Sequence, residues 1–358
     1  MSRNVRALRL ALPAALAAFA AGAAALRGTA TAVDRAAGFL AGLQGADGGW
    51  HSSTYGLLSS GQSLTPLVLG ALLDLPRGDA KRAFDFVVSQ LDAGGVLGHA
   101  DPMLDDYPTY ATALALEAAA RRGDDALVAR LAKGLRAMQL GEAHGWTPAE
   151  SAYGAWGMGR AVKPPHSGHV DLSMTRHALE ALAAAGAKRG DPAFERALRF
   201  VESCRAKDGG FYFSSVVVDA NKAGKDREGY RSYGTATADG ILSLLAMGFD
   251  PSDARVQSAA NWLVAHHRTD VAPGFPPGEP ERWADAMVHY YLAASAEVFR
   301  RLDVREAPAG HDWRAELERA LASRQRPDGS WRADSVLGKE DDPLIATALA
   351  LRALEAAR

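Results

Sequence analysis

Two stretches near the ends of this chain share one pattern: FLAGLQGADGGW over Phe39–Trp50 and LASRQRPDGSW over Leu321–Trp331. Each has an apolar helical segment, then a Gln, a Gly four residues after it, and a Trp six residues after it. Four related copies lie between them, so an apolar helix runs into a glycine-rich turn six times. This repeat indicates one supersecondary unit copied in tandem, because a single unit cannot bury its own apolar face.

The six turns are spaced by 46 to 66 residues, which leaves room for two helices and their loops. The third and fifth turns are predicted to be longer than the others and to end in Gly145-Trp146 and Gly274-Phe275. Gly tolerates a positive φ after a helix end, and the aromatic ring can pack back against the helices. The Gln-like positions of the turns are Gln44, Gln90, Gln139, Arg205, His267 and Gln325.

A second helix with apolar residues at helical spacing follows each turn. It carries almost no charge over its first ten residues, whereas the helix before the turn is amphipathic, as in 191–204. An apolar helix belongs inside a fold and an amphipathic one outside. The second helices are predicted to begin near Gln62, Tyr107, Asp171, Ser232, Trp283 and Pro343, and five carry an early Thr: Thr65, Thr112, Thr175, Thr237 and Thr347.

Six such pairs without strand-like alternation predict an all-α (α/α)₆ toroid, in which six outer helices surround six inner ones. An open solenoid is the alternative. The number of copies, and a chain that ends directly on an inner helix, favour a closed ring. We expect this toroid to form one domain over residues 33–358.

The composition excludes some functions. The net charge of −2 and the pI near 6.6 give no electrostatic footprint for nucleic acid. Cys204 is the only cysteine, so an intrachain disulfide is excluded.

The N-terminus is typical of an exported protein. Three arginines precede an uncharged stretch from Leu10 to Leu26, and Ala30-Thr31-Ala32 resembles a signal-peptide cleavage site. We therefore expect residues 1–32 to be a signal peptide and the mature protein to be periplasmic or secreted. An uncleaved N-terminal anchor and association with a membrane surface stay open as alternatives.

The repeated turns and the Thr-bearing inner helices resemble those of the terpenoid cyclase and protein prenyltransferase superfamily, above all the squalene-cyclase-type repeat proteins of bacteria. The resemblance covers about Asp34 to Arg358. It implies the same toroid, with a deep apolar cavity where the inner-helix N-termini meet. It also implies a hydrophobic, isoprenoid-like small molecule as the partner.

The catalytic motifs of that superfamily are incomplete here. Squalene-hopene cyclases begin an inner helix with Asp-x-Asp-Asp-Thr, whereas this chain has Asp171-Leu172-Ser173-Met174-Thr175, with Ser173 in place of the acid. A serine cannot protonate an alkene, which needs a carboxylic acid held neutral.

The zinc site of protein prenyltransferases is incomplete as well. Tyr230 stands where the resemblance requires a zinc-binding Cys. We therefore expect no metal and no cofactor.

Acidic residues before the inner helices are candidates for the missing acid. We single out Asp171, Asp106 and Asp105 as candidate catalytic residues, and note a second cluster at Glu340-Asp341-Asp342. The simpler interpretation, which we favour for these clusters, is that acids at helix N-termini are caps that suit the helix dipole.

Candidate ligand-binding residues lie near the expected cavity mouth. The loop Lys222–Arg231 is basic and could receive a diphosphate, and His166, His169 and Asp171 form an H-x-x-H-x-D run. Aromatic rings near an inner wall could stabilise carbocations, although packing is the simpler role. The predicted ligand-binding residues are Tyr107, Tyr110, Trp156, Thr175, His177, Arg231, Tyr233, Trp283, His289 and Tyr290.

Three functions remain open from the sequence. The first is an exported toroid that encloses an isoprenoid-like ligand with or without turnover. The second is a terpene cyclase that uses Asp106 or Asp171 as its acid. The third is a non-catalytic scaffold or peptide-binding surface, since fold alone does not fix function.

Overall fold

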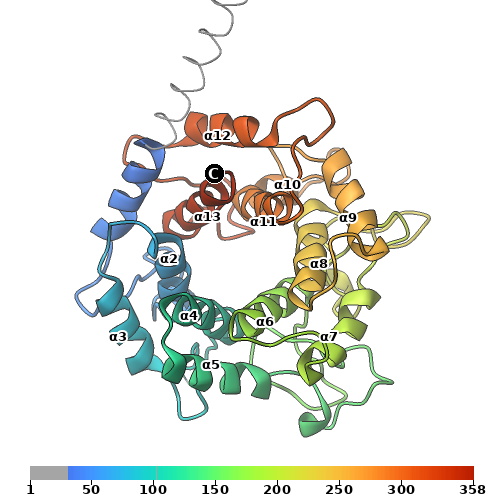
Figure 1. The fold of residues 1–358 in the computed structure, drawn as a ribbon, viewed down its shortest axis with the longest axis horizontal. Coiled ribbons are helices and arrows are strands. Elements are labelled where there is room, and N and C mark those ends of the chain that lie inside the picture. The colour runs from blue at the N-terminus through green and yellow to red at the C-terminus, as the bar shows by residue number, and fades with distance from the viewer. Residues whose placement is uncertain (1–30, 102) are drawn as a thin grey trace, which may run out of the picture.

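The computed structural model describes residues 31–101 and 103–358, so residues 1–30 of the predicted signal peptide lie outside it. Over the described residues the regular structure is helical, and a few isolated β-bridges join loops. In that part of the chain, no helix is both long and apolar enough to cross a membrane. Figure 1 shows two concentric rings of helices, as the repeats predict.

Six inner helices surround the central axis, and each contacts the next one along the chain. α13 also contacts α2, which closes the ring and excludes the open solenoid. They begin within two residues of the predicted positions, except the fifth, where the short α10 (Trp283–Ala286) comes first. The inner helices are α2 (Leu64–Leu72), α4 (Pro108–Arg122), α6 (Leu172–Ala184), α8 (Gly234–Ala246), α11 (Val288–Arg301) and α13 (Pro343–Ala356).

The outer ring consists of amphipathic helices. α3 buries only the side of the helix that carries Ala83, Phe84, Phe86 and Val87, whereas α6 is buried on all sides from Leu172 to Leu182. Buried apolar area is the main stabilising term, so this contrast places the core between the rings. The outer helices are the one over residues 31–42, α3 (Ala80–Gln90), α5 (Asp125–Ala137), α7 (Pro192–Ser203), α9 (Ala254–Ala265) and α12 (Trp313–Arg324).

The recurring residues of the turns contact the outer helix of the next repeat. Gly48 has a φ of +94°, and a Cβ there would lie 2.4 Å from the carbonyl oxygen of Arg82 in α3. The Gln44 amide also donates to the Asp79 carbonyl at 2.9 Å. The last turn repeats this contact with the first helix, because a Cβ on Gly329 would meet the Arg35 carbonyl oxygen at 2.5 Å. The same local device therefore closes the ring.

The early threonines of the inner helices hold the turns in place. In the first repeat, the Trp50 amide donates to Thr65 Oγ1 at 2.9 Å. The same bond recurs in four other repeats, with Leu97, Trp156, Phe211 and Trp331 donating to Thr112, Thr175, Thr237 and Thr347. The threonines are thus structural acceptors.

The third turn differs from the predicted alignment. Its glycine is Gly154, with a φ of +86°, and its aromatic residue is Trp156 rather than Trp146. The Trp156 indole donates to the Leu135 carbonyl at 2.8 Å, as the Trp50 indole does to Leu40 at 2.7 Å. An insertion that contains the 3-10 helix η2 (Glu142–His144) separates Gln139 from this glycine and hid the spacing.

Candidate functional site

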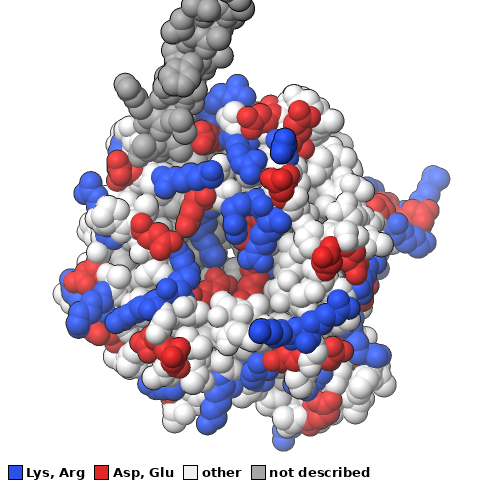
Figure 2. All heavy atoms as spheres, viewed as in Figure 1, with Lys and Arg blue, Asp and Glu red and all other residues white. Residues whose placement is uncertain are grey.

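A central cavity of about 1140 Å³ runs along the ring axis. One face of each long inner helix lines it at helical spacing, as with Tyr110, Leu114, Glu117 and Arg121 of α4. Residues near both ends of the inner helices line the cavity, so it extends along most of their length. Figure 2 shows basic and acidic side chains gathered around a central hollow.

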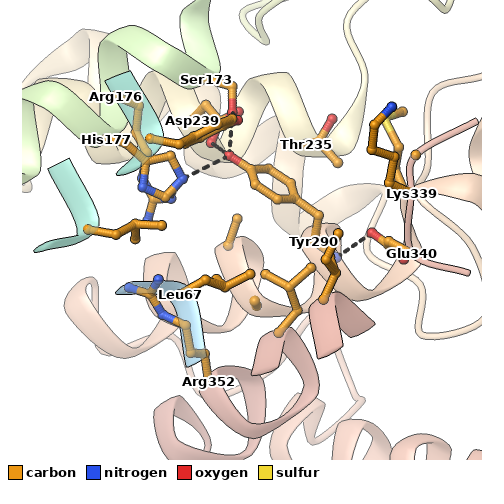
Figure 3. A pocket seen from close by; sticks show the side chains of 18 of the residues that line it. Leu67, Ser173, Arg176, His177, Thr235, Asp239, Tyr290, Lys339, Glu340 and Arg352 are labelled. Carbon is orange, nitrogen blue, oxygen red and sulfur yellow. Dashed lines mark hydrogen bonds between the residues drawn. The ribbon is translucent and has the colours of Figure 1, made fainter. Parts of the chain in front are cut away.

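A layer of hydroxyl groups crosses the cavity near the start of the inner helices. The Ser173 hydroxyl lies 2.6 Å from the hydroxyls of both Tyr110 and Tyr290. The Tyr290 hydroxyl donates to Asp239 Oδ1 at 2.8 Å, and the same hydroxyl lies 3.5 Å from His177 Nε2 (Figure 3). We call Tyr110, Ser173, Asp239 and Tyr290 the hydroxyl layer. It joins four inner helices around one carboxyl group.

Asp239 is the acid of this layer. Its side chain lines the cavity, yet the residue is only 1% exposed. Burial raises the pKa of Asp239 to about 7, against the opposing effects of the Arg176 charge and the Tyr290 hydrogen bond. At neutral pH a large fraction of this carboxyl is therefore protonated and available as an acid.

A layer of ion pairs crosses the cavity nearer the other end of the inner helices. Glu180 Oε2 lies 2.5 Å from Arg176 Nε, and its Oε1 lies 2.7 Å from Arg301. Arg352 lies 3.4 Å from Glu117 across the ring. Burial raises the pKa of Glu117, opposed by Arg352. We call these five residues the ion-pair layer.

The two carboxylates of this layer, together with His177, have the spacing of a metal site. Ligand atoms of Glu117, His177 and Glu180 lie within 4.8 Å of one another. Burial lowers the pKa of His177 well below its usual range, and the nearby arginine charges lower it further, so the ring is neutral. Both carboxylates, however, already pair with arginines, which oppose a cation. We therefore derive no chemistry from a metal there.

Lysines and aromatic rings form the mouth where the inner helices begin. Lys222 Nζ lies 3.7 Å from the centre of the Phe213 ring and 5.2 Å from that of Trp283. Lys339 Nζ lies 5.0 Å from the centre of the Tyr55 ring. Both lysines line the cavity. The mouth is thus cationic and aromatic.

The structure brings six of the predicted ligand-binding residues into the cavity wall: Tyr107, Tyr110, His177, Tyr233, Trp283 and Tyr290. The other four are engaged elsewhere. Trp156 and Thr175 hold the third turn together, as described above. Arg231 pairs with Asp226 at 3.5 Å, and His289 Nδ1 lies 2.9 Å from Glu340 Oε2. A ligand-binding role for the six residues in the wall stays a prediction.

The three predicted acids do not line the cavity in the described chain. Asp171 caps α6 by accepting from the Met174 amide at 2.8 Å, although burial also raises its pKa to about 7. Asp106 accepts from the hydroxyls of Ser60 and Ser63, both at 2.5 Å. Arg160 Nε donates to Asp105 at 3.1 Å. Capping and pairing account for these contacts, and a catalytic role for any of the three stays a prediction.

The second acidic cluster also serves helix ends. Glu340 accepts from the backbone amides of His289 and Tyr290, both at 2.8 Å, and Asp342 caps α13. In the H-x-x-H-x-D run, His169 lines the cavity 3.8 Å from Asp171, whereas His166 is exposed.

Asp239 was missed at the sequence level. It is the only carboxylate between Gly234 and Ala246, in a helix that is otherwise free of charge. A charge isolated in a buried helix is expensive unless it is neutral or paired, so its isolation was the available signal.

No protein-family model and no curated protein match this chain. Among solved structures, the ligand-free type II terpene cyclase MstE from Scytonema matches with a TM-score of 0.58 and 14% identity, over 93% of this chain and 98% of that one. A complex of a variant of that cyclase with its substrate, geranylgeranyl dihydroxybenzoate, gives a TM-score of 0.59.

Two further structures share the fold. A protein from Actinoplanes matches with a TM-score of 0.56 and 19% identity, over 92% of this chain and 99% of that one. An unsaturated glucuronyl hydrolase from Bacillus sp. GL1 matches with a TM-score of 0.55 and 14% identity, over 91% of this chain and 96% of that one. The predicted resemblance is confirmed at the level of fold: the chain is an α/α toroid similar to the type II terpene cyclases.

Proposed function

We propose that this protein binds an isoprenoid in its central cavity and cyclises it by protonation, with Asp239 as the acid. One observation carries the proposal: a buried carboxyl with a pKa of about 7 lines a cavity of about 1140 Å³. The type II cyclase from Scytonema, which shares the fold, binds a geranylgeranyl substrate. A prenyl chain of that class is therefore the first ligand to test.

The chemistry follows from the hydroxyl layer. The Asp239 carboxyl gives its proton to one carbon of an alkene, so that a C–H bond forms and the neighbouring carbon becomes a cation. A second alkene of the same chain attacks this cation and closes a ring. Loss of one proton from the final cation ends the reaction, which is an isomerisation overall. The hydrogen bond from Tyr290 stabilises the Asp239 carboxylate as it forms.

The walls of the cavity suit such a ligand. Apolar side chains line it between the polar layers, among them Leu67, Leu114, Ile345 and Leu349. Aromatic rings of Tyr107, Tyr110 and Tyr290 face the same space and attract a cation through their π faces. The resulting lining can hold a flexible hydrocarbon and stabilise positive charge along it.

Asp239 is favoured over the acids named from the sequence because of its position. Its carboxyl lines the cavity and accepts a hydrogen bond from the Tyr290 hydroxyl. The same hydroxyl contacts Ser173, which stands at the position where the resemblance expects the acid. Asp171 and Asp106 face helix ends instead. Asp239 thus supplies from α8 the acid that α6 lacks.

The test is to incubate the protein with geranylgeraniol, squalene and geranylgeranyl dihydroxybenzoate and to analyse the extracts by mass spectrometry. We expect a cyclic product from at least one of them, which Asp239→Asn abolishes and Asp106→Asn leaves. If Asp171→Asn abolishes the product and Asp239→Asn does not, Asp171 is the acid, as predicted from the sequence.

Two other results would reject catalysis. Release of an isoprenoid by organic extraction, without turnover of any substrate, would make the toroid a binding protein. A clean extract, with no binding of any of the three compounds, would favour the scaffold interpretation.

We also propose, from the N-terminal sequence alone, that the protein is exported and that its signal peptide is removed near Val33. N-terminal sequencing of the protein from fractionated cells tests this. A mature N-terminus within residues 28–36 is expected, and an intact Met1 in the cytoplasmic fraction would contradict it.

A further inference from the structure

The cations that line the cavity fall into two groups. Each of the arginines among them has a carboxylate within 4.0 Å; these are Arg121, Arg176, Arg300, Arg301 and Arg352. Lys222 and Lys339 line the same cavity, and neither has a carboxylate within that distance in the part of the chain that is described. The unpaired cations thus gather at the mouth where the inner helices begin.

Lys222 has fewer hydrogen bonds than its charge requires. An ammonium group has three N–H donors, and over residues 31–101 and 103–358 the one acceptor for Lys222 is the Ala220 carbonyl oxygen at 3.5 Å. Its Nζ lies over the Phe213 ring and within cation–π distance of the Trp283 ring, and these rings stabilise the charge but accept no conventional hydrogen bond. Burial lowers the pKa of Lys222 to about 8, so most of it stays charged at pH 7. A half-buried cation with few hydrogen bonds is stabilised by an incoming anion.

Lys339 belongs to the same mouth. A Cβ on the preceding residue, Gly338, would lie 2.1 Å from the Ala286 carbonyl oxygen, so this loop packs against α10, which carries Trp283. The positive ends of the inner-helix dipoles add to the charge of the two lysines.

The acids at the mouth do not form ion pairs with these two lysines in the described part of the chain. Glu281 accepts from the Trp283 indole at 2.5 Å, and Glu340 accepts from the amides that begin α11. Asp219 is exposed to solvent. Asp171 and Asp239 act on Lys222 only from beyond ion-pair distance, and burial holds the pKa of each at about 7.

We propose that Lys222, with Lys339 at the same mouth, binds an anionic head group of the ligand, either a carboxylate or a phosphate. This inference rests on the proposed function and narrows its substrate class to anionic prenyl amphiphiles. The head group lies on the cavity side of Lys222, next to the Phe213 and Trp283 rings that the ammonium group contacts, and the prenyl chain extends inward past the hydroxyl layer. An alkene of the chain then lies beside Asp239, and the head group stays away from the acid.

The experiment compares three probes that share one prenyl chain: geranylgeraniol, geranylgeranoic acid and geranylgeranyl diphosphate. Their dissociation constants are measured by calorimetry at pH 7 with the mature protein and with Lys222→Met, which keeps the length of the side chain. Lys225→Met is the matched control, because Lys225 is on the same loop but is exposed and stacks on Tyr230.

We expect one or both anions to bind the unaltered protein at least about tenfold more tightly than the alcohol, as a charge-assisted hydrogen bond predicts. Lys222→Met should remove this preference without weakening the alcohol, and Lys225→Met should keep it. The more tightly bound anion identifies the head group as carboxylate or phosphate.

Two results would overturn the inference. If the alcohol binds as tightly as both anions, or if Lys222→Met keeps the preference, the head-group site is rejected while the isoprenoid cavity stands. If none of the three probes binds, both the proposed function and this inference are rejected.

Discussion

The two polar layers of the cavity both contain carboxyl groups but differ in the partners that these groups have. In the ion-pair layer, Glu180 is held by Arg176 and Arg301, and Glu117 is held by Arg352. In the hydroxyl layer, Asp239 has a hydroxyl partner but, among the described residues, no cation within ion-pair distance. One layer thus has paired charges, and the other has an acid whose pKa burial raises to about 7.

This difference assigns a structural role to the ion-pair layer and a chemical role to the hydroxyl layer. A buried carboxylate that is paired cannot give up a proton near neutral pH, whereas a buried carboxyl without a cation can. We therefore expect changes in the ion-pair layer to affect the free energy of unfolding, and changes in the hydroxyl layer to affect turnover. The predictions below run from the largest expected effect to the smallest.

The largest effect is expected from Glu180→Gln. Glu180 and Arg176 both have side chains 7% exposed, and the substitution leaves the arginine buried without its partner. Removing one member of a buried pair costs about 3–5 kcal/mol of unfolding free energy, which denaturant titration measures. The exposed Glu195→Gln on α7 is the control and should change stability by less than about 0.5 kcal/mol. Equal effects of the two variants would remove the distinction between the layers.

Turnover should depend on pH through Asp239. Because its pKa is about 7 and the acid form is the reactive one, the rate should be constant below pH 6. It should fall about tenfold for each pH unit well above 7. The measurement is a pH–rate profile with an uncharged substrate, so that Lys222 does not contribute, alongside binding of the same compound. A rate that stays constant to pH 9, or a midpoint near pH 4, would exclude Asp239 as the acid.

Tyr290→Phe should lower turnover without unfolding the protein. The variant removes the hydroxyl that donates to Asp239 and bridges to Ser173, while the ring remains. Losing a hydrogen bond to a charge that develops in the reaction costs about 1.5–3 kcal/mol, or about ten- to a hundredfold in rate. Steady-state kinetics and denaturant titration on the same samples check both parts. Unchanged turnover would show that this hydroxyl does not assist the acid.

The smallest effect is expected from Arg121→Met at the far end of the cavity. Arg121 is hydrogen-bonded to Asp74, but the Asp74 side chain is 66% exposed. Exposed pairs contribute about 0–1 kcal/mol, because solvent screens them. Both stability and turnover should therefore stay near those of the unaltered protein, and a large loss of either would show that this end also takes part in function.

The fold could be predicted from the sequence because its rules are local. An early Thr accepts the same hydrogen bond from the turn in five repeats, and the Gln amide donates to the carbonyl of a turn glycine at positive φ in three. Where an insertion broke the spacing, as between Gln139 and Gly154, the prediction placed the wrong aromatic residue in the turn. Trp156 was therefore taken for a cavity residue.

The site was less predictable, because it depends on which side chains meet across the ring. Tyr110, Asp239 and Tyr290 come from three different helices, and only the closed ring brings them together. The predicted acids were chosen by proximity to helix N-termini, where Asp most often serves as a cap. Asp239 lies inside a helix, so that rule could not find it.

Difference infrared spectroscopy of the carboxylic C=O band tests the central claim most directly, since it needs no substrate. Comparing the unaltered protein with Asp239→Asn, and with Asp171→Asn to assign the second buried acid, isolates the signal of one side chain. The account predicts a protonated carboxyl band that Asp239→Asn removes and that titrates with a midpoint near pH 7. A band that is absent at pH 6, or unchanged by Asp239→Asn, would contradict it.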